Sequence, residues 1–318
     1  MKLSVIIPVY NAADKIHIMI DSIIKSKLDF EVICVNDGSK DNSVNVIENY
    51  NDERIKVLTK ENEGTFKAWQ YGLKYASGEY VTIFDQDDYI DEGYIEYIYY
   101  FMDNIKADVL ITPYYIEEES GENYVCEIGL EDGLYQEKDL YKIKDRILGG
   151  LIPYAKFTKV IKREVLQKQV KCTYQGQLRD FEDWLTMVEV FDFSDSIFIK
   201  NQSYYHYIQY SNSVSKSTLS YRKNFESLKK IMNVMRTKTY KKIDNNNYKS
   251  FCFYALNILL NKCLSIEEYD LAKEIIEMDI YHNQVLHSNI KKLKGLILYT
   301  KSLWVFRIKN KMRRYKDK

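Results

Sequence analysis

Three carboxylates fall within four residues of one another in this chain, at the end of an apolar run. The stretch YVTIFDQDDYID places Asp85, Asp87 and Asp88 directly after residues 80–84. Like charges a few ångströms apart repel, and a carboxylate is costly to remove from water. The cluster therefore predicts a cationic partner.

Two other interpretations of the acidic cluster can be compared with the sequence. As an EF-hand loop, Asp85, Asp87 and Glu96 would take positions one, three and twelve, but Tyr89 and Ile90 stand where a ligand and the turn glycine belong. A solvated acidic loop is the second interpretation, and these residues alone leave it open. The sequence also contains neither a GxxxxGKS/T loop nor a GxGxxG after its first apolar run, so the two common phosphate-binding loops are missing.

The elements around this cluster follow a regular order. Apolar runs at 3–9, 31–36, 55–59, 80–84 and 109–112 are predicted strands, with helical spacing of apolar residues between them. This alternation predicts an α/β fold with a mostly parallel sheet and helices on both faces. Ligands of such sheets bind beyond the carboxyl ends of the strands. The polar stretches at 10–11, 37–39, 62–64 and 85–87 each follow a strand, so we expect them to converge on one rim.

The rest of the chain is less regular. Residues 114–135 are predicted to form loops and short strands, 161–170 and 184–191 helices, and 197–207 a strand. From about residue 220 onward the pattern is helical.

Five motifs in register carry a resemblance to a known family. SVIIPVYN at 4–11, VNDGS at 35–39, NEG at 62–64, ASGEYVTIFDQDD at 76–88 and FEDW at 181–184 occur in this order. Together they resemble the family 2 glycosyltransferases of bacterial cell-surface polysaccharide synthesis, which have the GT-A fold. The resemblance is dense over 1–110, thinner to about 215, and ends there. It implies an inverting, metal-dependent hexosyl- or N-acetylhexosaminyltransferase that moves a sugar from a UDP-sugar to a glycan or lipid-linked acceptor.

The resemblance also gives the acidic cluster a role. Asp85-Gln86-Asp87 matches the DxD motif, which binds a divalent metal bridging the two phosphates of a sugar nucleotide. Oxygen ligands suit Mn²⁺ or Mg²⁺. By family position Asp87 is the direct ligand, and Asp85 is a further metal-site residue that faces the ribose or the sugar. His206 stands where some GT-A enzymes have a late metal ligand, while other relatives are variable there.

Donor-binding roles are implied in the same way. The matching positions are Pro8, Tyr10, Asn11, Asp37, Asn62, Gly64, Lys67, Asp85 and Gln86. Tyr10 would pack near the base, and Asp37 would accept a hydrogen bond from a pyrimidine N–H. Where many relatives have Ala-Arg-Asn, this chain has AWQ at 68–70, and Lys67 is the candidate substitute for the missing arginine.

The acidic pair Glu182-Asp183 matches the catalytic base region of inverting members. Inversion needs a carboxylate that removes a proton from the acceptor hydroxyl on the face opposite the leaving group. Asp183 is the predicted base, and Glu182 would orient the acceptor. The alternative is a pair of acids at a helix start that interact with the helix dipole.

Composition limits the classes of protein. Apolar residues make up 46% and charged residues 29%, and the formal net charge is zero, which is typical of a soluble globular protein and gives no overall field for nucleic acid. Five scattered cysteines without a CxxC pair indicate reduced thiols in a cytoplasmic protein. No run approaches the ~18 apolar residues of a membrane span.

The resemblance and the helical pattern together predict the domains. Residues 1–219 would form the GT-A domain, with a nucleotide-binding half at 1–110 and an acceptor-binding half at 111–219, and 220–318 a helical extension. From Ile290 the chain has eleven Lys or Arg residues and only Asp317 as an acid. This basic tail fits peripheral contact with an anionic membrane on the inner face of the plasma membrane, where a lipid-linked acceptor would be anchored. Docking onto the enzyme body is the alternative, and no nucleic-acid module accompanies it.

Two other functions are alternatives to glycosyl transfer. A sugar-nucleotide nucleotidyltransferase would need a glycine-rich loop with a basic residue near the first strand, and none follows Val9. A non-catalytic GT-A-like binding protein would have lost its carboxylates, whereas Asp85, Asp87 and Asp183 are all present.

Overall fold

The computed structural model describes residues 1–149, 152–176, 178, 181–210, 221–240, 242–265 and 268–278. The chain divides into two compact units, Met1–Lys216 and Ser217–Lys318. The first unit contains every candidate site residue. The predicted boundary at 219 and the basic tail from Ile290 lie outside the described residues.

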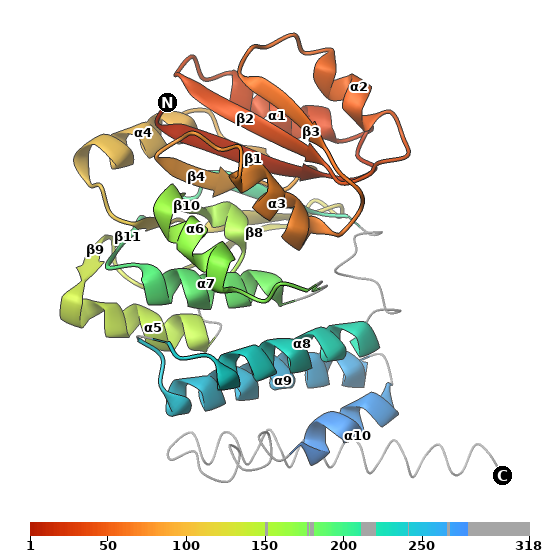
Figure 1. Ribbon diagram of the computed structural model, residues 1–318, viewed down its shortest axis with the longest axis vertical. Coiled ribbons are helices and arrows are strands. Elements are labelled where there is room, and N and C mark those ends of the chain that lie inside the picture. The colour runs from red at the N-terminus through yellow and green to blue at the C-terminus, as the bar shows by residue number, and fades with distance from the viewer. Residues whose placement is uncertain are drawn as a thin grey trace, which may run out of the picture. The chain divides into compact units, whose positions relative to one another are not determined.

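An eight-stranded sheet forms the centre of the first unit, in the order β3-β2-β1-β4-β10-β6-β11-β9 (Figure 1). Its strands are β1 Leu3–Val9, β2 Phe30–Asn36, β3 Ile55–Thr59, β4 Tyr80–Ile83, β6 Val109–Ile111, β9 Gly133–Gln136, β10 Lys159–Lys162 and β11 Ser196–Ile199. β1 pairs in parallel with β2 and β4, and β2 with β3. The five predicted strands are confirmed, but β10 was missed: it runs antiparallel between β4 and β6.

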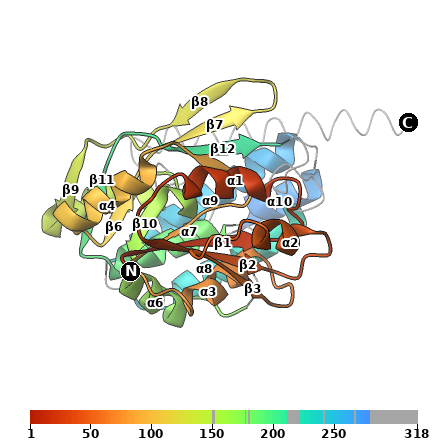
Figure 2. The same cartoon turned by 90° about the horizontal axis from the view of Figure 1, so that it is seen from above.

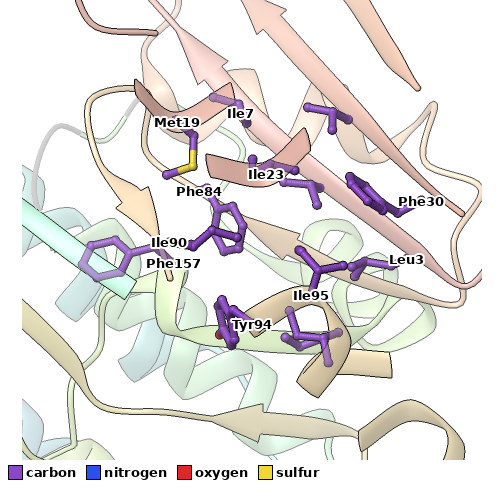
Figure 3. Packing of buried hydrophobic residues seen from close by; sticks show 14 of the residues in the cluster. Leu3, Ile7, Met19, Ile23, Phe30, Phe84, Ile90, Tyr94, Ile95 and Phe157 are labelled. Atoms are coloured by element: carbon purple, nitrogen blue, oxygen red, sulfur yellow. The ribbon is translucent and has the colours of Figure 1, made fainter. Parts of the chain in front are cut away.

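The alternation of side chains along β1 explains how helices cover both faces. Leu3 and Ile7 point to one face and pack with α1 (Ile16–Ile24) and α4 (Tyr94–Asn104), as Figure 3 shows. On the opposite face, α3 (Thr65–Leu73) approaches closely, because a Cβ on Gly72 would lie 2.8 Å from Ile6 Cγ2. Figure 2 shows the sheet edge-on between α1 and α3. A short helix, α2 (Ser43–Glu48), follows β2.

A second sheet of four short strands has the order β5-β12-β7-β8 (Figure 2). Its strands are β5 Tyr89–Ile90, β7 Tyr114–Glu118, β8 Asn123–Cys126 and β12 Tyr205–Gln209. The strand predicted at 197–207 is therefore wrong as one element: β11 belongs to the main sheet and β12 to the second. The polar residues 200–203 separate them. The acidic cluster connects β4 of the main sheet to β5 of the second.

Three helices complete the first unit: α5 Leu140–Leu148, α6 Arg163–Cys172 and α7 Glu182–Phe193. The helix predicted at 161–170 begins two residues later, because Ile161 and Lys162 pair with β4. The second unit contains α8 Tyr221–Thr237, α9 Asn245–Ser265 and α10 Tyr269–Glu277, in agreement with the helical pattern. Within the described part of the chain, no helix has both the length and the apolar character that crossing a membrane requires.

Candidate active site

The loops after β1 and β2 are bound to each other at the carboxyl edge of the sheet. The backbone N–H of Asn11 donates to Ser39 Oγ at 3.0 Å, and the N–H of Lys40 donates to Asn11 Oδ1 at 2.8 Å. Asn11 has a φ of 46°, a left-handed conformation that asparagine tolerates better than most residues. The expected convergence of these polar stretches is therefore seen directly.

Asp37 connects the end of β2 to the loop before α3. It is 2% exposed. Its Oδ1 accepts hydrogen bonds from Lys60 Nζ at 2.9 Å and from the backbone N–H of Glu63 at 3.1 Å. Its Oδ2 accepts one from the N–H of Gly64 at 2.7 Å. Asp37 thus shapes the loop that contains two other predicted donor residues.

Gln86, the central residue of the acidic turn, is turned toward the end of β1. Its Oε1 accepts a hydrogen bond from the backbone N–H of Tyr10 at 2.7 Å, and its Nε2 donates to the Tyr10 carbonyl at 3.2 Å. The side chain therefore fixes two loops to each other. Tyr10 itself is 46% exposed, so its ring is available at the rim.

The acidic turn is also held from the side of the second sheet. The backbone N–H of Asp85 donates to the hydroxyl of Tyr205 at 3.1 Å, and that hydroxyl donates to Asp88 Oδ2 at 2.7 Å. The N–H of Ile208 donates to Asp88 Oδ1 at 2.9 Å. Asp88 is fully buried and bonded to β12 at both oxygens, so it supports the turn.

Burial, and after it the charge of neighbouring carboxylates, raises the pKa values of the carboxylates in the turn. Burial, together with the charge of Asp85, raises the pKa of Asp87 to about 6, against a smaller lowering by Lys15. Burial also raises the pKa of Asp85, although Lys156 lowers it. Burial and neighbouring negative charge therefore outweigh the effects of Lys15 and Lys156 on these two carboxylates.

Lys156 brings the acidic turn together with the predicted base. Its ammonium lies 3.6 Å from Asp85 Oδ1, and 3.2 and 3.4 Å from the two carboxylate oxygens of Asp183. The side chain is 5% exposed. Burial opposes its charge, but Asp183, Asp85 and Glu182 raise its pKa above the ordinary value, so it stays protonated.

Asp183 lies in the first turn of α7, whose start is fixed by buried aromatic side chains. Phe181, just before the helix, is 4% exposed and has a left-handed φ of 63°, which is costly for a bulky residue. Trp184 is fully buried, donates from Nε1 to the carbonyl of Ile147 at 2.8 Å and stacks on Tyr154. The helix start therefore has little freedom to shift the carboxylate.

His206 lies in the second sheet with both ring nitrogens engaged. Nδ1 is 2.6 Å from Glu117 Oε1, and Nε2 is 3.0 Å from Asp91 Oδ1. Successive residues of a strand point to opposite faces. Because the Tyr205 hydroxyl contacts the acidic turn, the imidazole of His206 points away from it. The described geometry does not bring His206 to the DxD carboxylates.

The remaining predicted residues have simpler surroundings. Pro8 is buried in β1, and Asn62 is exposed next to Gly38, where a Cβ would lie 3.1 Å from the Asn62 nitrogen. Gly38 has a φ of +74°, so the approach of the two loops depends on glycine there. Lys67 is half-buried, and burial lowers its pKa. Glu182 is half-buried at the start of α7.

Comparison with known proteins decides the family. A family model described as glycosyl transferase family 2 matches residues 4–169. The chain belongs to this family. Glycosyltransferase GlyG of Streptococcus pneumoniae is 30% identical to it over 227 residues, which are 68% of this chain and 73% of that protein. The cholesterol galactosyltransferase of Borreliella burgdorferi is 24% identical over 310 residues, 93% of this chain and 84% of that protein.

The fold of this glycosyltransferase matches solved structures. The crystal structure of Staphylococcus aureus TarS 1–349 in complex with UDP-GlcNAc aligns with a TM-score of 0.72 at 21% identity, covering 99% of this chain and 92% of that chain. The predicted GT-A fold, with helices at its C-terminal end, is therefore confirmed.

Two residues of the glycosyltransferase site escaped sequence analysis. Lys156 lies in the apolar stretch IPYAKFTKVI at 152–161. A lysine in such a run is a signal of a buried ammonium, but Lys159 in the same run gives the same signal, so the pattern does not single out Lys156. Tyr205 lies in the aromatic run YYHY at 204–207, which does not distinguish it from its neighbours.

Proposed function

We propose that this glycosyltransferase moves a hexosyl or N-acetylhexosaminyl group from a UDP-sugar to a glycan or lipid-linked acceptor, with inversion and with a divalent metal. The observation that carries the proposal is the convergence of Asp85 and Asp183 on Lys156. A donor-side carboxylate and a candidate base thus lie on two sides of one ammonium. The name of TarS, poly(ribitol-phosphate) beta-N-acetylglucosaminyltransferase, and its complex with UDP-GlcNAc support a UDP-sugar as donor.

The surroundings of Asp37 support a uridine nucleotide. A carboxylate offers about four acceptor positions. Lys60 and the N–H of Glu63 use Oδ1, whereas among the described residues Oδ2 accepts from Gly64 alone. The free position on Oδ2 could accept the N–H of a uracil ring. Tyr10, exposed at the same rim, would pack against the base.

The DxD carboxylates fit a divalent cation. Among the described residues, no three His, Cys, Asp or Glu side chains form a group able to hold a metal ion. Asp85 and Asp87 nevertheless offer hard oxygen ligands, and burial together with the charge of Asp85 raises the pKa of Asp87. Mn²⁺ or Mg²⁺ takes few protein ligands when phosphates and waters complete its shell. When bound, the metal would neutralise charge on the departing diphosphate.

Asp183 is proposed to act as the general base. Its carboxylate would accept the proton of the acceptor hydroxyl while that oxygen bonds to the anomeric carbon. The bond from the anomeric carbon to the diphosphate breaks in the same step, and UDP leaves with the electron pair. Glu182, one residue earlier, would orient the acceptor. On this proposal residues 111–219 form the acceptor half, and the basic tail from Ile290 brings the enzyme to an anionic membrane.

A screen of sugar nucleotides tests the donor. Thermal stabilisation of the full chain is measured with UDP, UDP-sugars and nucleotides without uracil, each with and without Mn²⁺. We expect UDP and at least one UDP-sugar to stabilise the protein only with metal. Asp37→Asn should weaken this response, and Asp29→Asn, an exposed aspartate at the opposite end of β2, should not. Stabilisation by several nucleotides without uracil, and none by UDP, would refute the donor assignment.

A further inference from the structure

Lys156 is a buried cation of the site, and the charged groups next to it are carboxylates. Its ammonium faces carboxylates from two parts of the chain: Asp85, after β4, and Asp183, at the start of α7. Glu182 adds a third negative charge nearby. A buried lysine with so much opposing charge is not explained by packing alone, since an apolar side chain of similar size would cost less desolvation.

The turn that contains Lys156 is itself fixed. Lys159, which is fully buried, donates from Nζ to the carbonyls of Pro153 and Ala155, the latter at 2.8 Å, and to Thr158 Oγ1 at 2.7 Å. Thr158 Oγ1 also donates to the Ala155 carbonyl at 3.2 Å. The hydrogen bonds of Lys159 therefore hold residues 153–158 together, and they fix the backbone position of Lys156.

The contact of Lys156 with Asp183 orients the carboxylate and does more than neutralise it. Both oxygens of Asp183 lie within 3.4 Å of the same ammonium, so this contact sets the direction in which the carboxylate faces. Asp85 is contacted through one oxygen at the longer distance of 3.6 Å. Lys156 therefore contacts the proposed base, Asp183, more closely than it contacts Asp85.

We infer that Lys156 is a positioning residue for glycosyl transfer, which holds the Asp183 carboxylate beside the donor-side Asp85 so that it meets the acceptor hydroxyl. The inference rests on the proposed role of Asp183 as base. Lys156 takes no proton in the step: the acceptor proton goes to Asp183, and the ammonium keeps its own three hydrogens. A group that acts mainly through the base should affect transfer to an acceptor far more than the reaction of the donor with water.

A double-mutant cycle with two assays tests the inference. Lys156→Met removes the charge at similar length, and Lys156→Arg keeps it. Each is made in the wild-type and the Asp183→Asn chains. Transfer to acceptor and slow donor hydrolysis without acceptor are measured at saturating metal. Lys162→Met is the matched control, because Lys162 ends β10, the strand that follows the turn of Lys156, and pairs with Asp108 at 2.9 Å outside the site.

We expect Lys156→Met to lower kcat for transfer by ~10²-fold, the usual result of misplacing a catalytic group. Because Lys156 also contacts Asp85, the KM for donor and the hydrolysis rate should change, but much less than transfer, and Lys156→Arg should recover most of the transfer. In the Asp183→Asn chain, Lys156→Met should cause little further loss of transfer, because the effects of substituting two interacting residues do not add. Lys162→Met should transfer at the wild-type rate.

Two results would overturn the inference. One is an equal loss of transfer from Lys156→Met with and without Asp183, and the other is an equal loss of hydrolysis and transfer. If Lys156→Met does not fold, as judged by its melting temperature, Lys156→Gln replaces it in the same cycle with the same expectations. Full transfer by Asp183→Asn alone would instead refute the proposed base, so the two failures are distinguishable.

Discussion

Two carboxylates at opposite ends of the main sheet, the buried Glu31 and the half-buried Asp87, have pKa values displaced in opposite directions. Glu31, near the amino end of β2, is buried, which alone would raise its pKa. Hydrogen bonds from Lys56, Ser77 and Ser4 outweigh burial and lower the pKa to about 2. Asp87, beyond the carboxyl end of β4, has a pKa raised to about 6 by burial and by Asp85.

The difference lies in the partners of the two groups. Glu31 accepts four hydrogen bonds of 2.7 Å, two of them from Ser77 and one from the ammonium of Lys56. Asp87 instead has carboxylates beside it. A structural carboxylate is thus satisfied within the fold, whereas the acidic turn is left with charge that a ligand must compensate.

Asp87→Ala should have the largest effect. Transfer should fall below detection and most metal-dependent UDP affinity should disappear, because the metal loses its direct protein ligand. The fold should survive, since burying fewer like charges relieves repulsion. Calorimetry with UDP, with and without Mn²⁺, measures this together with the melting temperature. Unchanged metal-dependent binding by the variant would assign the acidic turn to another role.

Glu31→Gln should destabilise the protein by about 2–4 kcal/mol at neutral pH, because a lowered pKa is stabilising free energy. The sign follows from the folded pKa of about 2 against the ordinary 4.5: the contribution is complete above 4.5 and is lost as pH falls toward 2. Denaturant unfolding from pH 7 to pH 3 measures it. Exposed Glu79→Gln is the control, and equal stability of the two variants would contradict the account.

Metal-dependent UDP binding should weaken on acidification. The cation needs the ionised form of Asp87, whose pKa is about 6, so affinity should rise through this pH and fall ~10-fold per unit below it. Raising the Mn²⁺ concentration should shift the midpoint to lower pH, because metal competes with the proton. Binding titrations between pH 5 and pH 8 check this. A flat profile would mean that Asp87 is not the titrating ligand.

Much of the donor side was predictable because its signals are local. The strands ending at Val9, Asn36 and Thr59 show compact apolar runs, and each is followed by turn-forming residues, so their common edge follows from parallel pairing alone. The hydrogen bond from the N–H of Asn11 to Ser39 shows that the loops after β1 and β2 meet at this edge.

The acceptor side was less predictable because its geometry depends on long-range pairing. β10 has only four residues, two of them lysine, and becomes a strand because β4 and β6 flank it. The pairing of β10 between β4 and β6 also brings the preceding turn, with Lys156, between Asp85 and Asp183, which are far apart in the sequence. No local pattern distinguishes Lys156 from Lys159, although one faces the site and the other supports its turn.

The central claim is that Asp183 is the base of an inverting transfer, and one experiment tests it directly. Asp183→Asn is nearly isosteric, so donor and metal binding should remain close to wild type while transfer falls by ~10²–10⁴-fold. The anomeric configuration of the wild-type product is read by NMR in the same assay. The account predicts inversion together with this loss. Retention of configuration, or a variant with full transfer activity, would contradict it.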